Sequence, residues 1–216
     1  MGTGANGLSR FQHPRFARMY ERISAESERR GTAGCRDRVL AGLTGRVIEV
    51  GAGNGMNFAH YPRTVSEVVA VEPEDRLRAL AALAAADAPV PVRLVAAHAD
   101  GLPFEDADFD AGVASLVLCS VPEPGRSLAE LRRVIRPGGE LRFFEHVRSA
   151  RPLIGGFQDL ITPAWSRAGG GCHLNRDLAA EITAAGFEIG QMDRFAYRPL
   201  AFTPAHAHIL GTARRP

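Results

Sequence analysis

The stretch Glu49-Val50-Gly51-Ala52-Gly53-Asn54-Gly55 decides the fold, because it joins a short apolar run at residues 46–50 to a glycine-rich turn. Glycine has no Cβ atom, so this turn can be sharp and a ligand can approach its backbone amides closely. Its Gly-x-Gly-x-Gly spacing differs from the Gly-x-Gly-x-x-Gly of dinucleotide-binding loops. Glu49 would also repel a pyrophosphate bound at the N-terminus of the following helix. The turn therefore favours a ligand that carries a cation; a plain strand-to-helix turn is the alternative.

Strands and helices alternate along the chain on both sides of this turn. Seven apolar runs are typical of strands, at residues 46–50, 68–71, 92–96, 109–118, 141–147, 187–189 and 209–212. Stripes with helical spacing lie at residues 16–23, 77–84, 128–135 and 178–185. Asn175 is positioned to cap the last helix, and residues 151–171 are less regular. This alternation predicts an α/β fold, with a Rossmann-like, doubly wound, mostly parallel sheet that carries helices on both faces. The length of 216 residues fits a single domain, residues 1–216.

The composition excludes several classes of function. A net charge of +2 is too small to indicate a nucleic-acid partner. All 26 basic residues are arginine, which excludes a Schiff-base lysine and the lysine of a phosphate-binding P-loop. No apolar run approaches the ~18 residues of a membrane span, and the N-terminus does not resemble a secretory signal. We therefore expect a cytoplasmic protein, and the bias toward arginine and alanine favours a bacterial source.

The three cysteines, Cys35, Cys119 and Cys172, lie far apart in the sequence. Because no Cys-x-x-Cys pair is present, the sequence predicts neither a zinc site nor a redox dithiol, and we expect no metal. An odd number of cysteines without a secretory signal favours a reducing compartment. We expect Cys119 and Cys172 to pack as small apolar side chains.

A carboxylate closes the second predicted strand. Glu72 lies 17 residues after Gly55 and can accept hydrogen bonds from both hydroxyls of a ribose. Hydrogen bonds to a charged group contribute roughly 1.5–3 kcal/mol each. The alternative is a solvated acid at the start of the next helix, stabilised by the helix dipole. The glycine turn at this spacing favours the ribose interpretation, and Glu72 argues against the 2′-phosphate of NADP.

Further motifs extend this pattern to a known family. They are residues 49–55 with Glu72, Leu102-Pro103-Phe104, Phe109-Asp110 and Arg136-Pro137-Gly138-Gly139. Together they resemble the class I S-adenosylmethionine-dependent methyltransferases, and more narrowly the methyltransferase type 11 group. The resemblance implies a seven-stranded sheet whose last strand is antiparallel. It also implies S-adenosylmethionine as the cofactor and a small molecule as the methyl acceptor.

A second set of motifs resembles the branch that contains the alkyl-thiol S-methyltransferases. These motifs are Leu116-Val117-Leu118-Cys119-Ser120-Val121, Phe144-Glu145-His146-Val147, Gln158 with Pro163-Ala164-Trp165, and Gly171-Cys172-His173-Leu174-Asn175-Arg176. This narrower resemblance implies a thiol acceptor. A hydroxyl, amine or carbon acceptor stays open, as do an NAD-dependent oxidoreductase and a cofactor-binding protein without transferase activity.

The resemblance also assigns residues to the cofactor. They are Glu49, Gly51, Ala52, Gly53, Asn54, Glu72, Pro73, His98, Ala99, Asp100 and Ser115. The glycine turn would pack against the methionine part of the cofactor, with Glu49 near its amino or sulfonium end. Glu72 would hold the ribose. His98 stands where the family has an acidic residue, so Asp100 is the alternative partner for adenine.

For the transfer step, the main task of the protein is in-line placement of the acceptor, which can supply roughly 7–11 kcal/mol of the barrier. His146 is the candidate catalytic base, because it follows Glu145 at the carboxyl end of a predicted strand. Its alternative role is structural. Arg176, the second catalytic candidate, would hold an anionic acceptor or lower its pKa. Helix capping and a salt bridge are the alternative for Arg176.

Two segments outside the predicted sheet are candidates to enclose the acceptor. Residues 1–34 would form an N-terminal lid helix that carries Phe16 and Tyr20. Residues 151–175 would form an acceptor-side insertion that carries Trp165. Ordinary core packing is the alternative for all three aromatic residues. We expect the protein to be a monomer or a homodimer.

Overall fold

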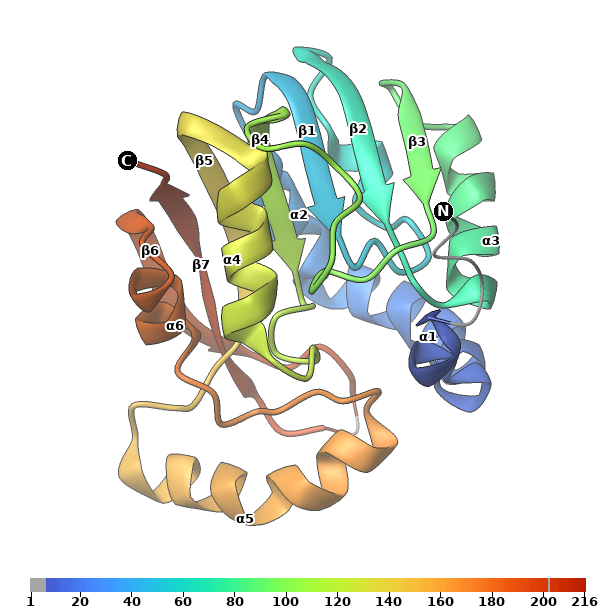
Figure 1. The fold of residues 1–216 in the computed structure, drawn as a ribbon. Coiled ribbons are helices and arrows are strands. Elements are labelled where there is room, and N and C mark those ends of the chain that lie inside the picture. Colours follow the sequence, from blue (N-terminus) through green and yellow to red (C-terminus); the bar gives the residue numbers. More distant parts are fainter. Residues whose placement is uncertain (1–6, 202) are drawn as a thin grey trace.

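Seven strands form a single sheet in the computed structural model, which describes residues 7–201 and 203–216 (Figure 1). The strands are β1 (Gly45–Val50), β2 (Val65–Val71), β3 (Val92–Val95), β4 (Phe109–Ser115), β5 (Ile135–His146), β6 (Glu188–Tyr197) and β7 (His206–Arg214). Their order across the sheet is β3-β2-β1-β4-β5-β7-β6. The pairs among β1 to β5 are parallel, and β7 is antiparallel to both of its neighbours. The predicted mostly parallel sheet with an antiparallel last strand is confirmed.

The order of the strands reverses at β1, which pairs with β2 on one side and with β4 on the other. After β1 the chain builds outward through β2 to β3 and then returns to add β4 on the opposite side. In an open α/β sheet, ligands bind in the crevice that such a reversal leaves at the carboxyl ends of the strands. The topology therefore places the glycine turn after β1 at this crevice.

Helices cover both faces of the sheet, as the alternation predicts. Side chains alternate across a strand, so β1 directs Ile48 and Val50 to one face and Val47 to the other. The first face packs against α4 (Pro124–Val134) and α6 (Leu178–Ala184), and the second against α2 (Ala33–Leu40) and α3 (Asp75–Ala86). Figure 1 shows α4 in front of the sheet and α2 behind it. The resulting apolar core fixes the strands that carry the site.

Several element ends differ from the prediction. The run 109–118 leaves the strand at Ser115, because Leu116 adopts a φ of +59° and turns the chain. The strands β6 and β7 are much longer than the apolar runs at residues 187–189 and 209–212, because their antiparallel pairing continues through the residues that flank these runs. Asp177, rather than Asn175, caps α6, and its carboxylate accepts a hydrogen bond of 3.3 Å from the amide of Ala180.

The carboxyl edge of the sheet carries two further helices (Figure 1). They are α1 (Pro14–Ser27) and α5 (Pro152–Ala168). The helix α5 occupies most of residues 151–171, which were predicted to be less regular, and it contains Pro163. Short helical turns lie at η2 (Ser9–Phe11), η3 (Glu28–Thr32) and η4 (Phe58–His60), and η3 joins α1 to α2. Within the described part of the chain, no helix has the length and apolar character needed to cross a membrane.

Candidate functional site

Two cavities lie side by side at the carboxyl edge of the sheet. The glycine-loop cavity, of about 470 Å³, is lined by the turn after β1, the end of β2 and the segment after β3. The cysteine cavity, of about 270 Å³, lies between α1, α5 and the ends of β4 and β5. Both are lined by Phe16 and Tyr20 of α1 and by Leu116 and Ser120, which follow β4. The two cavities therefore share a wall, and a group bound in one lies next to a group bound in the other.

The glycine turn has the backbone shape that the sequence predicts. Gly51 has a φ of +63°, and a Cβ atom there would lie 2.2 Å from Cγ2 of Val117. A side chain at this position would therefore overlap the segment after β4. The amide of Gly53 donates a hydrogen bond of 2.8 Å to Oε2 of Glu72, which joins the turn to the end of β2. Gly51, Gly53 and Glu72 thus form one continuous wall of the glycine-loop cavity.

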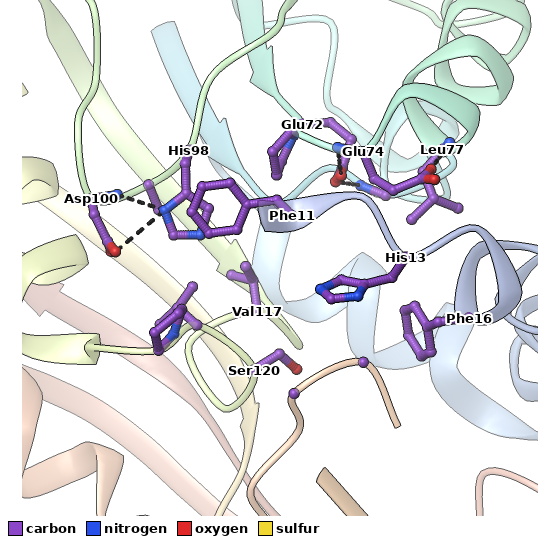
Figure 2. A pocket seen from close by; sticks show the side chains of 18 of the residues that line it. Phe11, His13, Phe16, Glu72, Glu74, Leu77, His98, Asp100, Val117 and Ser120 are labelled. Carbon is purple, nitrogen blue, oxygen red and sulfur yellow. Dashed lines mark hydrogen bonds and ion pairs between the residues drawn. The ribbon is translucent and has the colours of Figure 1, made fainter. Parts of the chain in front are cut away.

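Glu72 is buried, with 5% of its surface exposed, and it faces the cavity (Figure 2). Its second oxygen accepts a hydrogen bond of 2.9 Å from the amide of Glu74. Burial raises the pKa of this carboxyl above its usual value, although the amides of Glu74 and Gly53 oppose the rise. A carboxylate can accept about four hydrogen bonds. Each oxygen of Glu72 therefore keeps acceptor capacity toward the cavity, as a pair of ribose hydroxyls requires.

His98, Ala99 and Asp100 line the same cavity after β3. The amide of Asp100 donates to Nδ1 of His98 at 3.3 Å, and burial lowers the pKa of this histidine. The ring of Phe11 stacks on His98 with centroids 3.6 Å apart and an interplanar angle of 8° (Figure 2). Sequence reasoning missed Phe11, because one turn of 3-10 helix leaves no periodic pattern.

The neighbour of Phe11 anchors this N-terminal segment to the site. Nε2 of Gln12 donates a hydrogen bond of 2.8 Å to the carbonyl oxygen of Pro73, which also lines the glycine-loop cavity. The amide of Asp75 donates to Oε1 of the same side chain at 3.1 Å. Gln12 therefore ties η2 to the segment that links β2 to α3.

Three of the predicted cofactor residues, Glu49, Ala52 and Asn54, are not among the described residues that line the glycine-loop cavity. The carboxylate of Glu49 accepts hydrogen bonds from Nδ2 of Asn57 at 2.9 Å and from the hydroxyl of Tyr61 at 2.7 Å. Burial raises the pKa of Glu49 to about 7. Ala52 donates its amide to the carbonyl oxygen of Val71, and Asn54 donates its side-chain amide to Ser24. Glu49, Ala52 and Asn54 therefore support the glycine turn through contacts outside the cavity, whereas Ser115 lines the cavity.

The cysteine cavity contains a cluster that the sequence did not predict. His146 ends β5, and its Nδ1 lies 3.6 Å from the sulfur of Cys119 and 3.6 Å from that of Cys172. The two sulfur atoms are 3.7 Å apart. The hydrogen bond with Cys119 and the neighbouring imidazole of His146 lower the pKa of the Cys172 thiol well below its usual value, against the effect of burial. Cys119 and Cys172 are 53 residues apart, so sequence spacing gave no signal of their contact.

Arg176 is outside the described lining of both cavities. Its guanidinium donates to the carbonyl oxygen of Leu118 at 2.7 Å and to that of Pro122 at 3.4 Å. Burial lowers its pKa. These bonds support the segment after β4 that separates the two cavities. In this structure Arg176 therefore acts on the site through the backbone.

Comparisons with known proteins agree with this geometry. A family described as a methyltransferase domain matches residues 48–143. A human protein named thiol S-methyltransferase TMT1B is 35% identical over 182 residues, which cover 81% of this chain and 73% of the relative. The human thiol S-methyltransferase TMT1A is 30% identical over 205 residues, or 92% of this chain and 82% of the relative. A solved structure from Thermotoga maritima, described as a possible histamine N-methyltransferase, has the same fold. It matches with a TM-score of 0.70 and 21% identity over 94% of this chain and 97% of that one.

Proposed function

Because this chain belongs to the S-adenosylmethionine-dependent methyltransferases, we propose that it methylates the sulfur atom of a small thiol. The observation that carries the proposal is the shared wall of the two cavities. Phe16, Tyr20, Leu116 and Ser120 line both. A methyl donor in the glycine-loop cavity would therefore adjoin an acceptor in the cysteine cavity. The two human relatives are named as thiol S-methyltransferases, which favours sulfur as the acceptor atom.

The glycine-loop cavity suits S-adenosylmethionine by its shape and its donor set. Glu72 is a buried carboxylate with acceptor capacity toward the cavity, which matches the ribose hydroxyls. Pro73, His98, Ala99 and Asp100 would flank the adenine. When bound, the cofactor supplies a methyl group already activated on a sulfonium. The protein therefore needs mainly to orient the acceptor and to exclude water.

The cysteine cavity suits a small and largely apolar acceptor. Its wall includes Met19, Ile23, Trp165 and Leu200, so an aliphatic or aromatic body would be held by apolar contact. A thiol has a reference pKa near 8.5 and is a good nucleophile once ionised. His146 lines this cavity and is placed to accept the thiol proton. We therefore keep His146 as the proposed catalytic residue, and we assign Arg176 a supporting role.

The test compares matched acceptors in pairs, such as thiophenol with phenol and an alkanethiol with the corresponding alcohol and amine. Incubation with S-adenosylmethionine is followed by mass spectrometry of the methylated product and of S-adenosylhomocysteine. We expect the thioether, with kcat/KM for the thiol more than about tenfold above that of the alcohol, because the thiolate is formed more readily. Methylation confined to oxygen, nitrogen or carbon would overturn the proposal.

A cytoplasmic location, a bacterial source and a monomeric or dimeric state stay predictions.

A further inference from the structure

The cluster in the cysteine cavity has the dimensions of a metal site. Its three edges are 3.7 Å between the sulfur atoms of Cys119 and Cys172 and 3.6 Å from each sulfur to Nδ1 of His146. Tetrahedral zinc has Zn–S bonds of about 2.3 Å and Zn–N bonds of about 2.05 Å. These bond lengths give edges of about 3.8 Å between two sulfur ligands and about 3.6 Å between sulfur and nitrogen. The three atoms therefore occupy the positions of three ligands around a single tetrahedral ion.

The segment that carries Cys119 is held rigidly by the protein. The buried carboxylate of Glu145 accepts hydrogen bonds from the amides of Val117, Leu118 and Cys119 at 3.0, 2.8 and 3.1 Å. These bonds fix Cys119 relative to the end of β5, where His146 follows Glu145 directly. The backbone that presents two of the three ligand atoms is thus preorganised, which a metal site requires.

The segment that carries Cys172 is joined to the first one. The amide of His173 donates to the carbonyl oxygen of Cys119 at 2.7 Å. Gly171 has a φ of +91°, and a Cβ atom there would lie 2.6 Å from the carbonyl oxygen of Ser120. Glycine is therefore needed for this close approach. The approach brings Cys172 to Cys119 although many residues separate them in the sequence.

We propose that Cys119, His146 and Cys172 bind a zinc ion whose fourth position faces the cysteine cavity. All three residues line that cavity, so the open position is directed at the space assigned to the acceptor. Each thiol binds as a thiolate and releases its proton to solvent, with no change of oxidation state. Two thiolates and a neutral imidazole leave a Zn²⁺ site without net charge, which suits the apolar wall. Three protein ligands with one open position are typical of catalytic zinc rather than structural zinc.

The cluster has two alternative states, a disulfide and a metal-free cluster, which would give different experimental results from a zinc site. A disulfide needs the sulfur atoms about 2.05 Å apart, so it would require both segments to move. A metal-free cluster would be a hydrogen-bonded pair of thiols and an imidazole. Cys35 provides a matched control for both alternatives, because it is buried on α2 and does not belong to the cluster.

The experiment uses the full-length chain, purified under reducing conditions and with any histidine tag removed. Zinc content is measured by mass spectrometry, and Co²⁺ is used as a spectroscopic probe. We expect about one zinc ion per chain and a Co²⁺ spectrum with thiolate charge-transfer bands and tetrahedral ligand-field bands. Cys119→Ala, Cys172→Ala and His146→Ala should each weaken Co²⁺ binding more than about tenfold, whereas Cys35→Ala should leave it unchanged.

Binding of S-adenosylhomocysteine, measured by calorimetry, identifies which of these variants still fold. The proposal is overturned if folded variants bind Co²⁺ as the parent does, or if the parent gives no thiolate bands. A Cys119–Cys172 disulfide in the reduced preparation would overturn it as well. Because His146→Ala keeps both thiols, it tests the site even if the cysteine variants fail to fold.

In the zinc-bound form His146 would hold the ion instead of accepting the thiol proton, and a thiol bound at the fourth position would release its proton to solvent. The identity of the fourth ligand rests on the proposed function and is tested separately. Adding an alkanethiol to the Co²⁺ form should shift the charge-transfer bands, whereas the matching alcohol should not. Zinc binding without methylation of any thiol would overturn the proposed function and leave the metal site standing. Full thiol methylation after removal of zinc by a chelator would leave the proposed function standing and overturn the assignment of the acceptor thiol as the fourth ligand of the ion.

Discussion

At the scale of single residues, Glu72 is the proposed partner of the cofactor ribose. We expect Glu72→Ala to weaken binding of S-adenosylhomocysteine about 10- to 100-fold, because one or two charge-assisted hydrogen bonds are lost. Glu67 is the matched control. It is an acid on β2, the strand that Glu72 directly follows, but it forms ion pairs with Arg46 and Arg93 on the surface. Calorimetry of Glu72→Ala and Glu67→Ala checks this directly, and equal affinity for the two variants would contradict the ribose role.

His146 is expected to affect turnover more than cofactor binding. It lines only the cysteine cavity among the two described, so His146→Ala should lower kcat by roughly 100-fold with little change in the affinity for S-adenosylhomocysteine. His60→Ala serves as the control, since His60 pairs with Asp37 away from both cavities. An equal loss of turnover and cofactor affinity in His146→Ala would indicate a structural histidine.

Glu49 should make the stability of the protein depend on pH. Burial raises its pKa in the folded state to about 7, from an ordinary value of 4.5. Between these values the folded chain keeps a proton that the unfolded chain releases. The contribution of Glu49 to stability is therefore fully present below about pH 4.5 and is lost as the pH rises to about 7. The loss amounts to about 3 kcal/mol.

The measurement compares chemical unfolding of the parent with that of Glu49→Gln across this pH range. Glutamine cannot ionise, so the difference between the two proteins isolates the carboxyl group. We expect the parent to lose stability relative to Glu49→Gln as the pH rises through this window, and a constant difference would show that folding does not raise the pKa of Glu49.

Residue identity alone could not predict the cluster of Cys119, His146 and Cys172. The glycine turn and Glu72 were accessible to sequence reasoning, because they lie at the ends of consecutive strands and their spacing follows from the fold. The two cysteines instead come from separate loops that the fold brings into contact, for example through the Cys119–His173 hydrogen bond. Contacts of this kind depend on tertiary structure, which no local spacing encodes.

At the scale of the elements, burial determines which helix positions stabilise the fold. Leu131 on α4 is fully buried, whereas Leu83 on α3 is 70% exposed. We expect Leu131→Ala to lower the free energy of unfolding by about 2–5 kcal/mol, since it leaves a cavity in the core. Leu83→Ala should change it by less than about 0.5 kcal/mol. Urea unfolding of both variants tests the assignment of the inner face of α4, and similar losses would contradict it.

The strands were easier to predict where both faces are buried. The central strands β1, β2 and β4 are near-continuous apolar runs, and such runs mark buried parallel strands. In contrast, β6 alternates exposed and partly buried residues at the edge of the sheet, so only its apolar start was recognised. The helix α5 was missed because its glycines and Pro163 are typical helix breakers.

At the scale of the whole molecule, the arrangement of α1 against the two cavities implies a response to the cofactor. Phe16 and Tyr20 of α1 line both cavities, so a bound cofactor would add contacts to this helix. We expect S-adenosylhomocysteine to slow amide hydrogen exchange in α1 more than in α4, whose inner face is already fixed by the core. Exchange measured by mass spectrometry with and without the ligand decides this, with Glu72→Ala as a control that binds weakly. If exchange in α1 is unchanged at saturating ligand, the helix is a static wall of the site and the predicted role of the N-terminal segment as a lid is wrong.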